Sequence, residues 1–129
     1  MFFGRSKKND DPMQERIDCL IGSDASITGD VIFTGGLRID GHIKGDVTVS
    51  NINPGTLMIG DQGCIEGVVR VSHLIVFGEI KGTVYATGLV DMRSKCRING
   101  DVHYGELEVQ AGAVIEGNLV KQKSAGAPQ

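Results

Sequence analysis

A five-residue pattern recurs along the chain: an aliphatic residue, a variable residue, glycine, another variable residue and a second aliphatic residue. The pattern is centred on Gly29, Gly45, Gly67, Gly82, Gly100 and Gly117. Successive glycines lie 16, 22, 15, 18 and 17 residues apart, and the longest interval contains the turn signal Asn53-Pro54-Gly55. A repeat of about seventeen residues with one loop insertion therefore runs through most of the chain.

Apolar and polar residues alternate around each glycine, which is typical of short β-strands. Around the second glycine, Ile43 and Val47 fall on one face of the strand, and Lys44 and Asp46 fall on the other. One unit is too small to bury its apolar face alone, so we expect successive units to stack. The six copies predict an all-β fold, a parallel β-helix of about six coils, with Cys96 in its core.

Composition and charge narrow the classes of partner. The 129 residues include 19 glycines, and 40% of the chain is hydrophobic although only 5% is aromatic. The formal net charge is −3, and residues 17–120 hold 13 acidic and 7 basic side chains. This acidic body argues against nucleic acid as a partner, because phosphate contacts need clustered Lys and Arg. The sequence contains no Gly-Lys-Ser/Thr loop, so we expect no nucleotide to bind.

The residue types that carry most chemistry are few and scattered. The three cysteines are Cys19, Cys64 and Cys96. Their odd number and wide spacing match neither a disulfide framework nor the CxxC pairs of a zinc site. The histidines His42, His73 and His103 fall at different offsets from the repeat glycines, so we expect them on the surface rather than around a metal. We therefore predict no catalytic residue, no metal site and no cofactor.

The chain is expected to have three segments. These are a flexible N-terminal tail at residues 1–16, a β-helix at residues 17–120 and a disordered polar tail at residues 121–129. Neither tail resembles a cap, and an uncapped coil exposes strand edges over an apolar core. This favours stacking of one molecule on another. The residues predicted to form the polymer interface are Ile17, Leu20, Ile21, Leu107, Val109, Ile115 and Leu119.

The N-terminal tail predicts a peripheral membrane contact. The sequence has neither the apolar core of a signal peptide nor a run approaching the ~18 apolar residues of a transmembrane helix, so we expect a cytoplasmic protein. Its first eight residues combine two phenylalanines with three basic side chains, which suits weak binding to anionic lipid. The predicted membrane-binding residues are Met1, Phe2, Phe3, Arg5, Lys7 and Lys8.

The repeat Ile-Lys-Gly-Asp-Val and the stretch Leu37-Arg38-Ile39-Asp40-Gly41-His42-Ile43-Lys44-Gly45 resemble the bactofilins. The layout of short tail, Gly/Val/Ile-rich centre and polar tail is also similar. The resemblance implies a right-handed, triangular β-helix that polymerises without nucleotide into non-polar filaments. It further implies a bacterial cytoskeletal scaffold on the inner face of the cytoplasmic membrane. There it would recruit proteins that make or modify the cell wall and help to set cell shape.

Two other interpretations of the repeat remain. One is a β-helix adaptor that does not polymerise. The other is a left-handed hexapeptide β-helix enzyme of the acyltransferase or carbonic anhydrase class. That fold repeats every six residues, whereas the intervals here vary from 15 to 22 and keep no six-residue register. Its active-site histidines also need matched positions between coils, which these three do not have.

Overall fold

The computed structural model describes residues 17–50 and 55–122, and these residues form eighteen short strands and no helix. The strands are β1 (Cys19–Ile21), β2 (Ser26–Thr28), β3 (Val31–Phe33), β4 (Gly35–Ile39), β5 (His42–Lys44), β6 (Val47–Val49), β7 (Gly55–Ile59), β8 (Cys64–Glu66), β9 (Val69–Val71), β10 (His73–Val76), β11 (Glu79–Lys81), β12 (Val84–Ala86), β13 (Leu89–Met92), β14 (Arg97–Asn99), β15 (Val102–Tyr104), β16 (Glu106–Val109), β17 (Val114–Glu116) and β18 (Leu119–Lys121).

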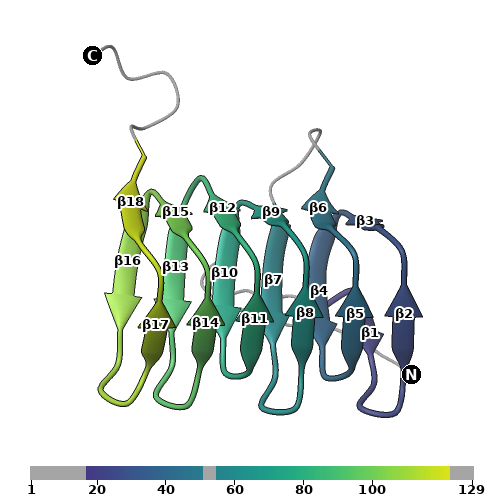
Figure 1. Ribbon diagram of the computed structural model, residues 1–129. Coiled ribbons are helices and arrows are strands. Elements are labelled where there is room, and N and C mark those ends of the chain that lie inside the picture. Colours follow the sequence, from purple (N-terminus) through teal and green to yellow (C-terminus); the bar gives the residue numbers. More distant parts are fainter. Residues whose placement is uncertain (1–16, 51–54, 123–129) are drawn as a thin grey trace.

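Three parallel sheets form the sides of a solenoid (Figure 1). Sheet A has the order β1-β4-β7-β10-β13-β16, sheet B runs from β2 to β17, and sheet C runs from β3 to β18. Every coil contributes one strand to each sheet, so each strand pairs with the strand three places further along the chain. The eighteen strands therefore make six coils, and the predicted parallel β-helix of about six coils is confirmed.

The core consists of inward columns that run along the stack. Equivalent residues pair across neighbouring strands: in sheet B, Ile43 pairs with Ile65, and in sheet C, Val47 pairs with Val69. All four side chains are at most 1% exposed, as expected from the alternation around the repeat glycines. Cys96 is 1% exposed and packs in this core, as predicted. Burial of each such aliphatic side chain contributes about 1.5–3 kcal/mol.

The repeat glycines stand at the corner between sheets B and C, where the chain must turn sharply. Gly67 and Gly82 occupy this corner in neighbouring coils, with φ of 156° and 148°. A Cβ atom on Gly82 would collide with the carbonyl oxygen of Gly67, so the stacking distance leaves no room for a side chain. Both the backbone conformation and the close approach require glycine, which explains why the repeat is marked by this residue.

Aspartates after the repeat glycines connect successive coils at the same corner. Asp30 Oδ1 accepts a hydrogen bond of 3.0 Å from the backbone N–H of Asp46, and Asp46 Oδ1 accepts one of 3.0 Å from Val68. Asp101 repeats the contact with Asn118 at 3.1 Å. The Gly-Asp pair therefore supplies a turn and an acceptor for a corner N–H group of the next coil.

The long interval of the repeat corresponds to an extended connection between sheets C and A. The strand β6 ends at Val49 and β7 begins at Gly55, whereas β3 and β4 are separated by Thr34 alone. Asn53 and Pro54 of the predicted loop lie outside the described residues. The last strand ends at Lys121, one residue beyond the predicted end of the β-helix.

Candidate functional site

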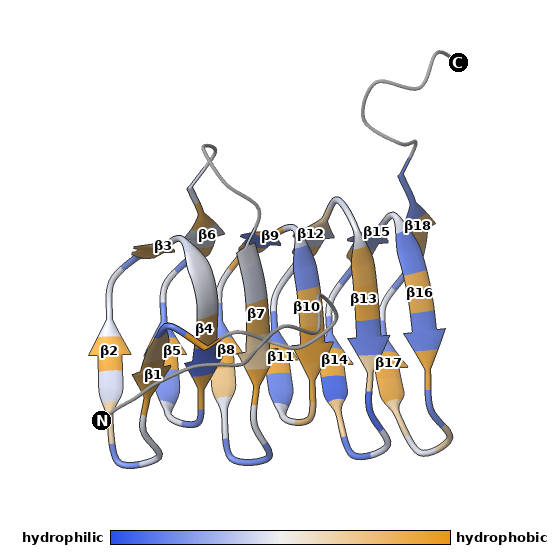
Figure 2. Cartoon of the chain, turned by 180° about the vertical axis from the view of Figure 1, so that it is seen from behind, coloured by the Kyte–Doolittle hydropathy of each residue, from blue (hydrophilic) through white to orange (hydrophobic). Residues whose placement is uncertain are grey.

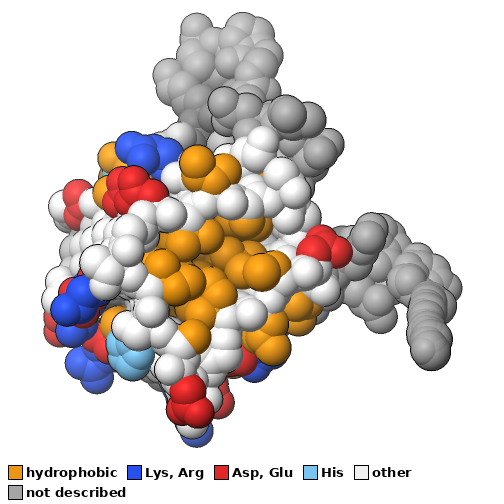
Figure 3. Space-filling model, turned by 90° about the vertical axis from the view of Figure 1, so that its right-hand side faces the viewer, with side chains coloured by type: hydrophobic (Ala, Val, Ile, Leu, Met, Phe, Trp, Pro, Cys, Tyr) orange, Lys and Arg blue, Asp and Glu red, His pale blue; other side chains and the backbone are white. Residues whose placement is uncertain are grey.

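The N-terminal end of the solenoid exposes the inside of its first coil. No described strand pairs with the outer edges of β1, β2 or β3. The inward residues Ile21, Ile27 and Val31 are only partly buried, although they pack against the core. Figure 3 looks onto this end and shows hydrophobic side chains gathered at its centre. The first coil therefore presents an apolar surface together with open strand edges.

The C-terminal end is open in the same way. Leu107, Val109, Ile115 and Leu119 continue the inward columns, since they pair with Val90, Met92, Ile98 and Val102, respectively. Those four partners are fully buried, whereas Val109 is 48% exposed and Leu119 is 44% exposed. The difference is the absence of a seventh coil among the described residues. A molecule stacked on this end would supply one.

Burial of these ends would favour association. Covering the exposed part of one half-buried aliphatic side chain contributes about 1 kcal/mol, half the value for complete burial. With backbone hydrogen bonds between the strand edges, three such side chains at the N-terminal end and four at the C-terminal end make an interface of useful strength. The surface that each molecule would bury at such a contact equals the cross-section of the solenoid.

The structure places the seven predicted interface residues at the two ends, but not all with the same orientation. Ile21, Leu107, Val109, Ile115 and Leu119 belong to inward columns. Leu20 pairs with Arg38 on the outer side of sheet A and is 59% exposed. Ile17 precedes β1 and is 46% exposed. Sequence inspection missed Ile27 and Val31, which repeat positions would have identified as inward residues of the first coil.

The three histidines lie on three different sheets: His42 on sheet B, His73 on sheet A and His103 on sheet C. The ring of His103 stacks on Tyr85 with centroids 4.6 Å apart, and the guanidinium of Arg70 lies 5.3 Å from the Tyr85 centroid. Among the described residues, no group of three or more His, Cys, Asp or Glu side chains is placed to hold a metal.

The buried cysteines are poor nucleophiles. Burial raises the pKa of the Cys96 thiol above its ordinary value of 9.0. Burial, and then the negative charge of Glu79, raise the pKa of the Cys64 thiol in the same direction. Both thiols are therefore protonated at neutral pH. Cys19, in the open first coil, is the exposed cysteine.

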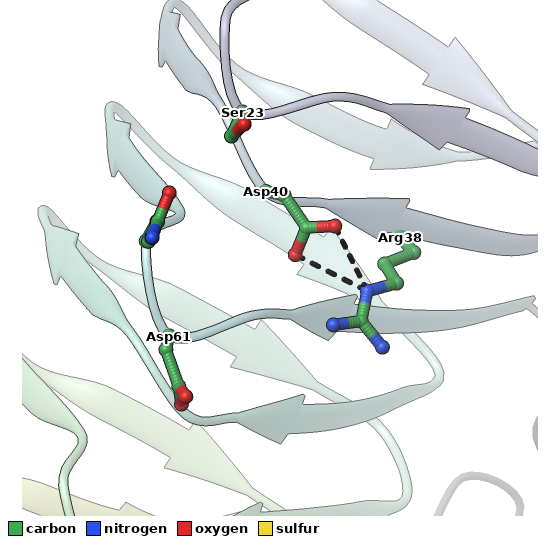
Figure 4. Close-up of a pocket in the computed structure, with 5 residues that line it drawn as sticks. Ser23, Arg38, Asp40 and Asp61 are labelled. Atoms are coloured by element: carbon green, nitrogen blue, oxygen red, sulfur yellow. Dashed lines mark hydrogen bonds and ion pairs between the residues drawn. The ribbon is translucent and has the colours of Figure 1, made fainter.

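A polar hollow lies at the corner between sheets A and B, where turns of the first and third coils project beyond the shorter corner of the second (Figure 4). Ser23, Arg38, Asp40 and Asp61 line it, and Arg38 Nε donates to both carboxylate oxygens of Asp40 at 3.1 Å. The ion pair is partly exposed to solvent, so it is worth little to stability. The hollow holds neither a cysteine nor a histidine that could act as a nucleophile or base.

The predicted membrane-binding residues Met1, Phe2, Phe3, Arg5, Lys7 and Lys8 lie outside the described residues. Within residues 17–50 and 55–122, no helix is long and apolar enough to cross a membrane.

The molecule is a solenoid of three-stranded coils, with a glycine corner in each coil and an open apolar surface at each end. Comparison with known proteins identifies its family. The sequence model of a family described as "Bactofilin: Polymer-forming cytoskeletal" matches residues 19–120. The chain belongs to the bactofilin family. This bactofilin therefore comes from a structural family whose members polymerise, which favours a scaffold over the hexapeptide-type enzyme.

Individual relatives agree with this assignment. This bactofilin is 25% identical over 100 residues to bactofilin BacO of Myxococcus xanthus strain DK1622, covering 78% of this chain and 76% of BacO. It is 26% identical over 100 residues to BacP of the same strain, covering 78% of this chain but 40% of BacP. Its fold is similar to the solid-state NMR structure of the cytoskeletal bactofilin BacA, with a TM-score of 0.70 and 32% identity, covering 81% of this chain and 95% of BacA. The predicted family and fold are confirmed.

Proposed function

We propose that this bactofilin forms filaments by stacking molecules end to end through the first and sixth coils, with no nucleotide required. One observation carries the proposal: side chains of the inward columns are fully buried in the middle of the stack and partly exposed at both of its ends. Residues 17–120 form the polymerisation domain, and Lys121 extends its last strand. The inward residues of the two end coils form the interface, namely Ile21, Ile27 and Val31 at the N-terminal end and Leu107, Val109, Ile115 and Leu119 at the C-terminal end. Ile17 and Leu20 lie at the edge of the N-terminal surface.

The filaments are non-polar, so the N-terminal ends of two molecules meet at one contact and the C-terminal ends of two molecules meet at the next. They lie on the inner face of the cytoplasmic membrane and recruit proteins that make or modify the cell wall. These statements rest on the resemblance to bactofilins. The protein acts as a scaffold with no catalytic role.

Met1 to Lys8 provide the membrane contact. Each Phe side chain contributes at most ~1.5–3 kcal/mol when buried in lipid, and each basic residue adds about 1 kcal/mol near anionic headgroups. One such peptide binds weakly and reversibly. A filament presents many copies at once, and avidity converts weak single contacts into firm attachment.

Assembly is tested by sedimentation of purified protein at micromolar concentration. We expect polymer in the pellet with no ATP or GTP present, and no change when either is added. A protein that sediments only as monomer would exclude end-to-end stacking as its mode of action.

Membrane binding is tested by liposome co-sedimentation. Replacing both phenylalanines, Phe2→Ser and Phe3→Ser, is expected to release the protein from anionic liposomes while polymers form as before. Raising the salt concentration is expected to weaken binding of the unmodified protein, because the basic residues are then screened. Equal binding of both proteins at every salt concentration would refute the membrane contact.

A further inference from the structure

The outer side of sheet A carries an apolar strip that takes no part in the proposed stacking of the ends. Met58 and Ile75 pair directly on β7 and β10, and Leu89 lies on the next strand, beside His73. All these residues point away from the core, because their neighbours in each strand are the inward ones. Sheet A faces the viewer in Figure 2. We call Met58, Ile75, Phe77 and Leu89 the sheet A strip.

Two groups on this outer side are shielded from solvent. Ile75 is only 8% exposed, whereas Tyr85, an outward residue of the same coil on sheet C, is 37% exposed. The Nε atom of Arg93 is also buried and has no hydrogen-bond partner among the described residues. The rest of this guanidinium contacts Asp91 at 3.1 Å and lies 5.2 Å from the Phe77 ring. An apolar centre beside an unsatisfied donor suits a chain segment that offers both apolar side chains and backbone carbonyls.

The N-terminal tail enters the described chain at this sheet. Ile17 precedes β1, which is the first strand of sheet A. Ile75 lies three coils further along the stack, about 14 Å away at ~4.8 Å per coil. The fourteen residue steps from Phe3 to Ile17 can span up to about 46 Å when extended. The first residues of the chain can therefore reach every part of the strip.

The N-terminal tail also matches the outer side of sheet A in charge and hydrophobicity. The tail begins with Met1-Phe2-Phe3, followed by Arg5, Lys7 and Lys8. Beyond the apolar strip, the C-terminal part of the same outer face is acidic, with Glu106 and Glu108 exposed on β16. Apolar residues placed on the strip would leave the basic residues close to this acidic part.

The C-terminal tail is a poorer occupant. It leaves the solenoid from β18, which belongs to sheet C. Residues 122–129 contain Gln, Lys, Ser, Ala, Gly and Pro, and therefore no large apolar side chain to fill the strip.

We infer that residues 1–8 dock on the sheet A strip of their own molecule when no membrane is present. Docking buries Phe2 and Phe3 away from water and gives Arg93 Nε an acceptor. The lipid and the sheet A strip then compete for the same side chains, so the membrane-binding peptide stays on the strip until a membrane is near. The consequence for membrane binding rests on the proposed function, whereas the docking contact does not.

The contact is tested by photo-crosslinking of the full chain. A benzoylphenylalanine replaces Phe3, and light and heavy isotopic forms of the protein are mixed without lipid before irradiation. We expect crosslinks to tryptic peptides 45–70 and 71–81, which contain Met58 and Ile75, and we expect light tails to join light peptides. Ile75→Glu, and independently Met58→Glu, should abolish them. The matched control Thr48→Glu adds the same charge on the outer side of sheet C and should leave them unchanged.

Binding to vesicles that contain anionic lipid tests separately whether docking of the tail on the strip weakens membrane binding. If the tail is docked about four-fifths of the time, Ile75→Glu should bind vesicles about fivefold more tightly than Thr48→Glu. Crosslinks lost in Ile75→Glu with no vesicle binding by any variant would support the docking and refute the membrane contact. Crosslinks that persist in both strip variants, that scatter over all sheets, or that join light tails to heavy peptides would overturn the inference.

Discussion

Leu119→Arg is expected to block polymerisation at one end while the fold survives. Leu119 pairs with Val102 in an inward column of sheet C, and its 44% exposure shows that the sixth coil leaves it open. In a free molecule the arginine stem can lie on the coil with its charge in water. In a stacked molecule the guanidinium would be buried without a partner, which costs about 3–5 kcal/mol. At 1.4 kcal/mol per tenfold change, the concentration needed to form the contact rises at least a hundredfold.

Val120→Arg is the matched control. Val120 is the next residue of β18, is 40% exposed and pairs with His103 on the outer side of sheet C. An arginine there points away from the stacking surface, so polymers should form as in the unmodified protein. Sedimentation velocity at micromolar concentration compares the two variants, and circular dichroism checks the fold of each. Non-polar filaments predict that Leu119→Arg stops at a dimer joined through its N-terminal ends. Normal polymers from Leu119→Arg, or equal loss in Val120→Arg, would refute the assignment of the C-terminal surface.

Two further predictions concern the coil itself. Gly82→Ala should lower the free energy of unfolding by about 1–3 kcal/mol, because φ of 148° and the Gly67 carbonyl oxygen both exclude a Cβ atom. Gly22→Ala is the control and should change the melting temperature little, because no atom lies near the added Cβ. Equal melting temperatures for the two variants would contradict this role of the corner glycine. Because burial raises the Cys96 pKa in the folded state, the contribution of this thiol to the free energy of unfolding should be constant well below pH 9.0 and fall as the pH rises through and above it. Cys96→Ala should therefore reduce the alkaline slope of stability against pH in denaturant titrations; an unchanged slope would show that this thiol is not a titrating group.

The sequence predicted the coil well because the relevant signals are local. Alternation around the glycines determines which side chains point inward, so Ile43, Val47 and Cys96 were placed correctly in the core. The spacing of the glycines also determined the number of coils. These features depend on neighbours within a few residues and on a repeat that brings equivalent residues into register.

Features that depend on contacts between coils were not predictable in the same way. Leu20 precedes the first repeat glycine by nine residues, and only the pairing with Arg38 shows that it points outward. The repeat puts Tyr85 and His103 in register, since each lies three residues after a repeat glycine, but the stacking of their rings is seen only in the structure. The shielding of Ile75 has no signal in the sequence, since an aliphatic residue in β10 fits either face.

Electron cryo-microscopy of filaments grown from purified protein without nucleotide tests the central claim most directly. If solenoids stack end to end, strands run across the filament axis at ~4.8 Å spacing, and the six coils of each molecule occupy about 29 Å of its length. The first and sixth coils should meet neighbouring molecules with no solvent gap. Filaments whose strands run along the axis, or whose contacts use the outer sides of the sheets and leave the coil ends open, would contradict the account.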